Sequence, residues 1–244
     1  KEELQCRKIT NTKIISLGVP QFGADWNFYI NGVYKKWKRD IPALPENKTK
    51  ALLILSSEKH IQWEKMDYYF TNFDIINKLI KQNIFLLIKP HPRQDLKILN
   101  KILETIPKSN YQFVDGLISF WSNKVDYVVS GLSMGCLLSL PVGKIPHVYW
   151  PINNDYKKFL DRTKNSKIVD VLLKKCDDGE YRFVLDEFVI WSSSNSLILK
   201  DICRDASDEI FNNFNRVFQP ETPAEKFRKV IANSISEKIP SNDF

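Results

Sequence analysis

Two short stretches of the sequence carry side chains suited to binding an anion such as a phosphate. The first is Lys89-Pro90-His91-Pro92-Arg93, which directly follows the apolar run 84–88. The two prolines restrict the backbone around His91, so the imidazole and both cations are held at the end of a strand. Guanidinium and ammonium groups bind phosphate by charge-assisted hydrogen bonds, to which a protonated imidazole would add. The alternative is a stiffened turn in which His91 caps a carbonyl.

The second stretch is Ser130-Gly131-Leu132-Ser133, where an apolar strand runs into a helix start. Gly131 permits a close approach to the backbone, and a helix beginning at Ser133 offers its hydroxyl and free N–H groups to an anion. The alternative is an ordinary serine N-cap, with the glycine serving helix–sheet packing. Because both stretches end strands, the pair predicts one anion site rather than two unrelated turns.

A third strand end adds weaker candidates. Ser56, Ser57 and Lys59 follow the apolar run 51–55. If this run is a strand of the same parallel sheet, its polar end lies at the same edge as the two stretches above. We therefore include all three side chains among the candidate ligand contacts.

The remaining chemistry-bearing residue types are sparse. Three histidines and four cysteines without a CxxC pair predict free thiols and no metal site; the cysteines are Cys6, Cys136, Cys176 and Cys203. His147 lies in a short apolar run and is expected to be a satisfied core residue. No GxGxxG or GxxxxGK[ST] sequence is present, so neither a dinucleotide cofactor nor a P-loop is predicted.

The composition indicates a folded globular domain with a basic surface. The 244 residues are 43% hydrophobic and 27% charged, which excludes a disordered or fibrous chain. The formal net charge of +7 favours an anionic partner, although a solvated basic surface explains it equally well. No nucleic-acid-binding module accompanies the charge, so we do not expect a nucleic acid partner.

The hydrophobic pattern predicts an α/β fold with a doubly wound parallel sheet. Apolar runs of strand length alternate with segments of helical period. Strands are expected at 13–17, 51–55, 84–88, 111–114, 125–129 and 146–149. Helices are expected at 25–38, 68–82, 96–106 and 133–140, with a short helical piece at 119–123. In such a sheet the carboxyl ends of the strands bind ligands, and all three candidate stretches lie there.

The last third of the chain is predicted to be mostly helical. Residues 207–218 are amphipathic, and Thr222-Pro223-Ala224-Glu225 combines a capping box with proline at the first helical position. Residues 181–191 are ambiguous between strand and helix. We expect an entry segment (1–49), a ligand-binding α/β domain (50–165) and a helical C-terminal extension of that domain (166–244).

The two motifs resemble the second domain of GT-B transferases that assemble bacterial surface polysaccharides. Lys89-Pro90-His91-Pro92-Arg93 followed by Ser130-Gly131-Leu132-Ser133 is similar to sequences in CDP-glycerol glycerophosphotransferases and in CMP-sugar users such as Kdo- and sialyltransferases. Gly18-Val19-Pro20-Gln21-Phe22, with Asp25-Trp26 behind it, resembles the segment that enters this domain. Gln21 stands where that segment has arginine. The likeness spans about residues 13–150.

The resemblance implies a metal-independent glycosyltransferase that uses a nucleotide-sugar donor, CMP- or CDP-linked. His91 and Arg93 would neutralise charge on the leaving phosphate. The other donor contacts would be Ser56, Ser57, Lys59, Lys89, Pro92, Ser130, Gly131 and Ser133. The implied partners are a glycan or lipid-linked acceptor and a preceding Rossmann-like domain, which carries the acceptor site.

Other functions remain open at this stage. A polyol-phosphate transferase with a CDP donor would use the same motifs but break the other phosphate bond. A UDP-sugar 2-epimerase shares the architecture but needs a carboxylate in a turn such as 130–135, which has none. A non-catalytic module with this fold is a further alternative. The absence of a signal sequence and of an apolar span leads us to expect a cytoplasmic protein, and the cluster 35–39 suggests peripheral contact with an anionic membrane.

Overall fold

A six-stranded sheet in which every neighbouring pair of strands is parallel forms the centre of the protein. The computed structural model describes residues 43–56, 65–150, 173–193 and 204–218, together with the isolated residues 29, 32, 160, 161, 164, 197, 199 and 229. The strands lie in the order β3-β2-β1-β4-β5-β8. Their bounds are β1 Thr49–Ile54, β2 Ile84–Lys89, β3 Tyr111–Phe113, β4 Tyr127–Ser130, β5 Pro146–Trp150 and β8 Ile190–Ser193. The predicted α/β class with a parallel sheet is confirmed.

The strand order places a topological switch point between β1 and β4. The chain runs outward from β1 through β2 to β3, then returns to β4 beside β1 and runs outward on the other side. In open parallel sheets of this order, ligands bind beyond the carboxyl ends of the strands near this reversal. The ends of β1 and β4 are therefore the first place to look for a site.

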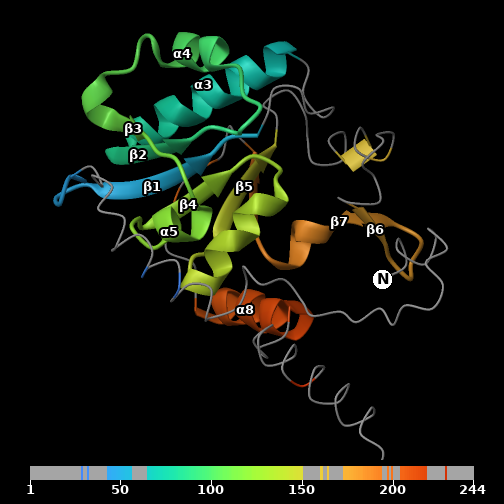
Figure 1. Ribbon diagram of the computed structural model, residues 1–244. Helices are drawn as coiled ribbons and strands as arrows, with labels where there is room; N and C mark the ends of the chain where they lie inside the picture. Colours follow the sequence, from blue (N-terminus) through green and yellow to red (C-terminus); the bar gives the residue numbers. More distant parts are fainter. Residues whose placement is uncertain are drawn as a thin grey trace, which may run out of the picture.

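Helices cover both faces of the sheet (Figure 1). On one face α3 (Lys65–Lys81) and α4 (Leu96–Leu103) pack with alternate residues of the strands, in a core that includes Ile76, Leu86 and Leu99. The opposite face is covered by α5 (Ile118–Ser122), the 3₁₀ helix η3 (Met134–Val142) and α8 (Arg204–Phe218). Because the central strands are buried on both faces, their sequences read as continuous apolar runs.

The region after β5 departs from the mostly helical prediction. Residues 173–193 contain an antiparallel hairpin, β6 (Leu173–Lys175) and β7 (Tyr181–Phe183), followed by the 3₁₀ helix η4 (Val184–Glu187) and by β8 at the sheet edge. Asp177, Asp178 and Gly179 form the turn of this hairpin, in which Gly179 has φ +83°. Three-residue strands contain too little periodicity to be recognised in the sequence. The ambiguous stretch 181–191 thus resolves into β7, η4 and the start of β8.

Several predicted elements differ from the structure in their type or bounds, or lie outside the described residues. The predicted helix 96–106 ends at Leu103, and the helix expected at 133–140 is the 3₁₀ helix η3, which contains Pro141. The strand 13–17, most of the helix 25–38 and most of the helix that Thr222-Pro223-Ala224-Glu225 was expected to begin lie outside the described residues. The amphipathic helix expected at 207–218 is confirmed as α8.

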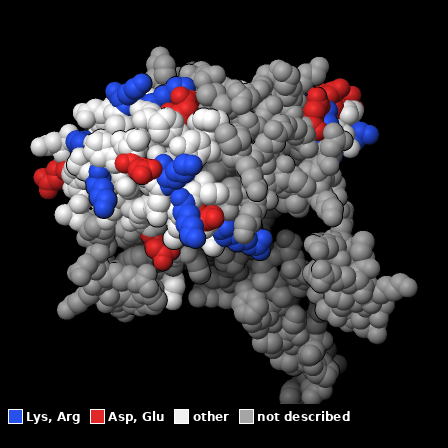
Figure 2. Space-filling model, turned by 90° about the horizontal axis from the view of Figure 1, so that it is seen from above, with Lys and Arg blue, Asp and Glu red and all other residues white. Residues whose placement is uncertain are grey.

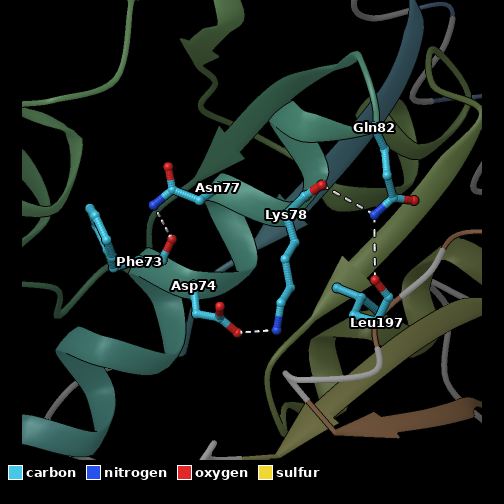
Figure 3. A network of polar contacts seen from close by, with 6 residues as sticks. All are labelled: Phe73, Asp74, Asn77, Lys78, Gln82 and Leu197. Atoms are coloured by element: carbon cyan, nitrogen blue, oxygen red, sulfur yellow. Dashed lines mark hydrogen bonds and ion pairs between the residues drawn. The ribbon is translucent and has the colours of Figure 1, made fainter.

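The side chain of Gln82 joins the end of α3 to the chain that follows β8 (Figure 3). Its Nε2 donates to the carbonyl of Leu197 at 3.4 Å and to that of Lys78 at 3.2 Å. Its Oε1 accepts from the backbone N–H of Leu199 at 3.2 Å. Asn83, with φ +59°, then ends the helix. One amide thus ties two segments more than a hundred residues apart.

We expect Gln82→Leu to lower the free energy of unfolding by roughly 1–3 kcal/mol, because it removes two long-range hydrogen bonds of about 1 kcal/mol each. Urea denaturation of the variant measures this loss. The matched control is Asn77→Ala, since the Asn77 amide donates to Phe73 within the same helix. If both variants lose the same stability, Gln82 does not tie the two segments together.

Candidate functional site

The Lys89–Arg93 loop forms a tight, internally bonded turn at the carboxyl end of β2. The backbone N–H of Arg93 donates to Nδ1 of His91 at 3.0 Å, and the N–H of Gln94 donates to the His91 carbonyl at 2.9 Å. An Nδ1 atom that accepts a hydrogen bond has no proton, so this geometry describes a neutral imidazole with its proton on Nε2. The half-buried ring is thereby fixed beside exposed Pro92 and Arg93. His91 is thus placed as a hydrogen-bond donor rather than as a third cation.

The helix that follows this loop contributes no additional anion site. Asp95 is the N-cap of α4, and its carboxylate accepts from the backbone N–H of Lys97 at 2.8 Å. A carboxylate at this position satisfies the helix terminus that would otherwise attract a phosphate. The cations of the loop are therefore the groups left to bind an anion here, namely half-buried Lys89 and exposed Arg93.

The two serines of the turn after β4 have different hydrogen-bonding roles. Ser130 is fully buried, and its hydroxyl donates to the Gly131 carbonyl at 2.7 Å. Ser133 is half-buried and is the N-cap of η3, where its hydroxyl oxygen accepts from the Gly135 N–H at 3.2 Å. The capping alternative for Ser133 is thus realised in the structure, and its hydroxyl proton stays available for a ligand. Ser130 acts within the protein, and a direct contact between its side chain and a ligand has no geometric support.

The ends of β1 and β4 meet closely at the switch point. The N–H of Gly131 donates to the Ile54 carbonyl at 3.3 Å, and a Cβ atom at position 131 would lie 3.1 Å from Oγ of Ser56 and 3.5 Å from the hydroxyl of Tyr149. Ser56 is buried, with 1% of its surface exposed. An alanine at this position would therefore press on the Ser56 side chain, which glycine avoids. Ser57 and Lys59, the other two candidates of this strand end, lie outside the described residues.

The hydroxyl of Tyr149 braces this junction from β5. It donates to Oδ1 of Asn72 on α3 at 2.7 Å, and both side chains are completely buried. The sequence analysis did not single out either residue, because a tyrosine in an apolar strand and an asparagine in a helix are each unremarkable alone. Only the packing of α3 on the sheet shows that they form one buried polar contact beneath the switch point.

A cavity of about 500 Å³ opens beside the Lys89–Arg93 loop. One wall is the loop itself, with Pro90, His91 and Pro92, and the other walls come from the first turns of α4 and from the end of β3. The cavity thus lies toward the β3 edge of the sheet, whereas Gly131 and Ser133 lie on the opposite side of the loop, next to β1. The structure places His91 between the cavity and the switch point.

Two buried titratable groups lie away from this rim. Burial raises the pKa of the Cys136 thiol to about 12, so that this cysteine is an inert core residue. His147 is 4% exposed on β5, and burial lowers its pKa to about 4. The prediction that His147 is a core residue is correct, but neither ring nitrogen has a hydrogen-bond partner among the described residues. It is therefore not a satisfied core histidine.

The surface over α3 and α4 mixes charges of both signs. Figure 2 shows lysine and arginine side chains interspersed with aspartate and glutamate on the described part of this face. Pairs such as Lys78 with Asp74 contribute to this pattern. A nucleic-acid-binding surface needs a continuous basic stripe, which the described residues of this face do not form.

Within the described residues, no group of three or more potential metal ligands occurs, and none of their helices combines the length and apolar character needed to cross a membrane.

Three solved structures are distantly similar to this chain. UDP-GlcNAc 2-epimerase from Neisseria meningitidis, solved with UDP-GlcNAc bound, is 12% identical with a TM-score of 0.46, over 97% of this chain and 59% of that one. KpsC from Thermosulfurimonas dismutans, a beta Kdo 2,7 transferase, is 14% identical with a TM-score of 0.31, over 87% and 66%. A mutant of S. aureus TarM in complex with UDP is 11% identical with a TM-score of 0.35, over 78% and 37%.

With TM-scores below 0.5, these similarities support no conclusion about the function of this chain. The chain spans between 37% and 66% of the length of the three structures. No protein-family model matches the sequence, and no curated protein matches it. The order of the strands and the contacts described above are therefore the basis for a functional proposal.

Proposed function

We propose that this chain is the donor-binding half of a GT-B glycosyltransferase that transfers a sugar from a CMP- or CDP-linked donor to a surface glycan. The observation that supports the proposal is the arrangement at the carboxyl rim of the sheet. A rigid loop with two cations and an oriented imidazole lies on one side of the switch point. The glycine–serine turn lies at the switch point itself. The acceptor is a glycan or a lipid-linked glycan, bound with the help of a preceding Rossmann-like domain.

Each group has a defined role in this proposal. Lys89 and Arg93 balance the charge of the donor phosphates, and the His91 Nε2–H donates to the oxygen on which charge develops as the glycosyl bond breaks. The hydroxyl and the backbone N–H groups at Ser133 hold a second phosphate oxygen. Since hydrogen bonds hold the His91 ring and the Ser133 cap in place, these groups stabilise the leaving nucleotide without requiring a divalent ion.

Nucleotide binding by the full chain tests the proposal. We expect CMP and CDP to raise the melting temperature in a thermal-shift titration, and UDP, GDP and ADP to do so less. His91→Ala removes a donor to charged oxygen, so it should weaken CDP binding about tenfold. EDTA should change neither result.

The control is Arg182→Ala, which removes a cation from β7, where it pairs with Asp178. This variant should bind CDP as the unaltered chain does. An equal effect of both variants would mean that net charge, rather than the loop, binds the nucleotide. If no nucleotide changes the melting temperature, the proposed donor site is wrong for this chain.

A further inference from the structure

The cavity beside His91 has the wrong chemistry for a phosphate. Its wall carries one carboxylate, Asp115, and the side-chain amides of Gln94 and Asn100. Lys89 and Arg93, the cations of the neighbouring loop, are not among its lining residues. A carboxylate repels phosphate oxygens and attracts hydrogen-bond donors. The cavity is therefore suited to a neutral group that carries N–H or O–H donors.

An exposed aromatic ring gives the cavity a platform for a planar ligand. Phe113, at the end of β3, is 42% exposed, and Leu96 on α4 is 56% exposed. The ring of Tyr111 meets that of Phe113 edge-on, with 5.8 Å between centroids and 79° between planes, which restricts the orientation of the Phe113 ring. Stacking of a base on such a ring strengthens binding whichever base it is. The apolar surface favours a flat ring over a flexible polar chain.

The carboxylate of Asp115 is held in place by its own loop. The indole Nε1 of Trp121 donates to the Asp115 carbonyl, and the N–H of Val114 donates to the carbonyl of Ile88 at 2.9 Å. Oδ1 of Asp115 accepts from the N–H of Gly116 at 2.7 Å. Among the described residues no donor binds Oδ2, so one carboxylate oxygen is presented to a ligand without reorganisation of the loop.

We propose that this cavity is the base pocket of the donor site and that it selects a nucleobase with an exocyclic amine. The amine donates a hydrogen bond to Asp115 while Phe113 stacks on the base. This inference rests on the proposed function, since it assigns a second part of the ligand bound at His91. Cytosine, adenine and guanine all carry such an amine, at C4, C6 and C2 respectively. Uracil presents a carbonyl oxygen at the corresponding position, which the carboxylate repels.

The spacing of the strands agrees with a ligand of nucleotide length. The end of β3 and the end of β4 are three strand spacings apart, about 14 Å. A base on Phe113 therefore places the phosphates of an extended nucleoside diphosphate alongside His91 and toward Ser133. The base pocket and the phosphate site form one continuous rim.

Calorimetric titration of the full chain with CMP, UMP and AMP tests the inference, because CMP and UMP differ chiefly in the group that Asp115 is expected to read. We expect CMP to bind at least about tenfold more tightly than UMP, the usual contribution of one charge-assisted hydrogen bond. Asp115→Asn keeps the acceptor for Gly116 and supplies an N–H₂ donor, so the ratio should fall to about one or reverse. The control is Asp95→Asn at the cap of α4, which should leave the ratio unchanged.

A second variant separates stacking from amine recognition. Phe113→Leu should weaken CMP and UMP by the same factor of about ten, since stacking does not distinguish the bases. Since ADP is expected to raise the melting temperature less than CDP, AMP should bind more weakly than CMP. Binding of AMP as tight as that of CMP would overturn the choice of a cytidine donor. Equal binding of CMP and UMP, or a ratio unaffected by Asp115→Asn, overturns the base pocket while a loss of binding in His91→Ala would still support the phosphate site. Failure of all nucleotides to bind overturns both.

Discussion

The free energy of unfolding is expected to fall by about 2 kcal/mol between pH 7.5 and pH 5 because of His147 alone. Burial on β5 lowers the pKa of this imidazole from 6.5 to about 4. The unfolded chain therefore binds a proton at pH values where the folded chain does not. The stabilisation is complete above pH 6.5 and is lost as the pH falls toward 4. Since one pKa unit corresponds to about 1.4 kcal/mol, the full loss is about 3 kcal/mol.

The surroundings of His147 explain why the charged form is so unfavourable. The strand register places it between Val129 on β4 and Ile190 on β8, and the Tyr127 ring lies edge-on at 6.1 Å between centroids. Neither ring nitrogen has a hydrogen-bond partner among the described residues. A proton on this ring would thus be buried without any group to balance its charge.

Urea denaturation of the unaltered chain and of His147→Phe, at both pH values, measures the effect. Phenylalanine keeps a planar ring in the core and cannot titrate. The free energy of unfolding of the variant should therefore fall by about 2 kcal/mol less between the two pH values than that of the unaltered chain. All other titratable groups are common to both proteins and cancel in the comparison. Equal pH dependence of the two proteins would show that His147 is protonated without cost.

The sequence was sufficient to predict the central strands, because burial on both faces makes them continuous apolar runs. The runs 51–55 and 84–88 became β1 and β2 with shifts of no more than two residues at either end. β6 was missed and β7 was ambiguous between strand and helix, because three residues such as Tyr181–Phe183 contain only one alternation of polar and apolar side chains. β8 is stabilised by its pairing with β5, a contact more than forty residues distant in the chain. Local pattern contains no information on such a pairing.

The candidate site divides in the same way. The loop around His91 and the turn at Gly131 are local motifs, and their residue types alone indicated a strand end that binds an anion. Phe113 and Asp115 became candidates only when the pairing of β2 with β3 placed them across a cavity from His91. Asp115 directly follows a predicted strand, and this position could have marked it as a candidate. Only the strand order shows that this strand end lies beside the His91 loop.

The close contact between Gly131 and Ser56 at the switch point gives the second prediction. Gly131→Ala should lower the free energy of unfolding by roughly 1–3 kcal/mol, the usual cost of adding a methyl group to a filled interior. The new Cβ atom would lie 3.1 Å from Oγ of Ser56, and both residues are buried. Since the methyl group would also stand at the rim between β1 and β4, CDP binding should weaken with stability. Gly32→Ala is the control, because a Cβ atom there meets nothing within 4 Å.

A double-mutant cycle with Ser56→Ala identifies the cause. Removing Oγ of Ser56 leaves its Cβ atom 3.6 Å from the added methyl group, an ordinary contact distance. Gly131→Ala should therefore cost about 1 kcal/mol less in the Ser56→Ala background than in the unaltered chain, a coupling typical of residues in contact. Additive effects would mean that the glycine is required by the backbone or by the hydroxyl of Tyr149 at 3.5 Å. A coupling of this size would show that the ends of β1 and β4 are in direct contact through Ser56 and Gly131.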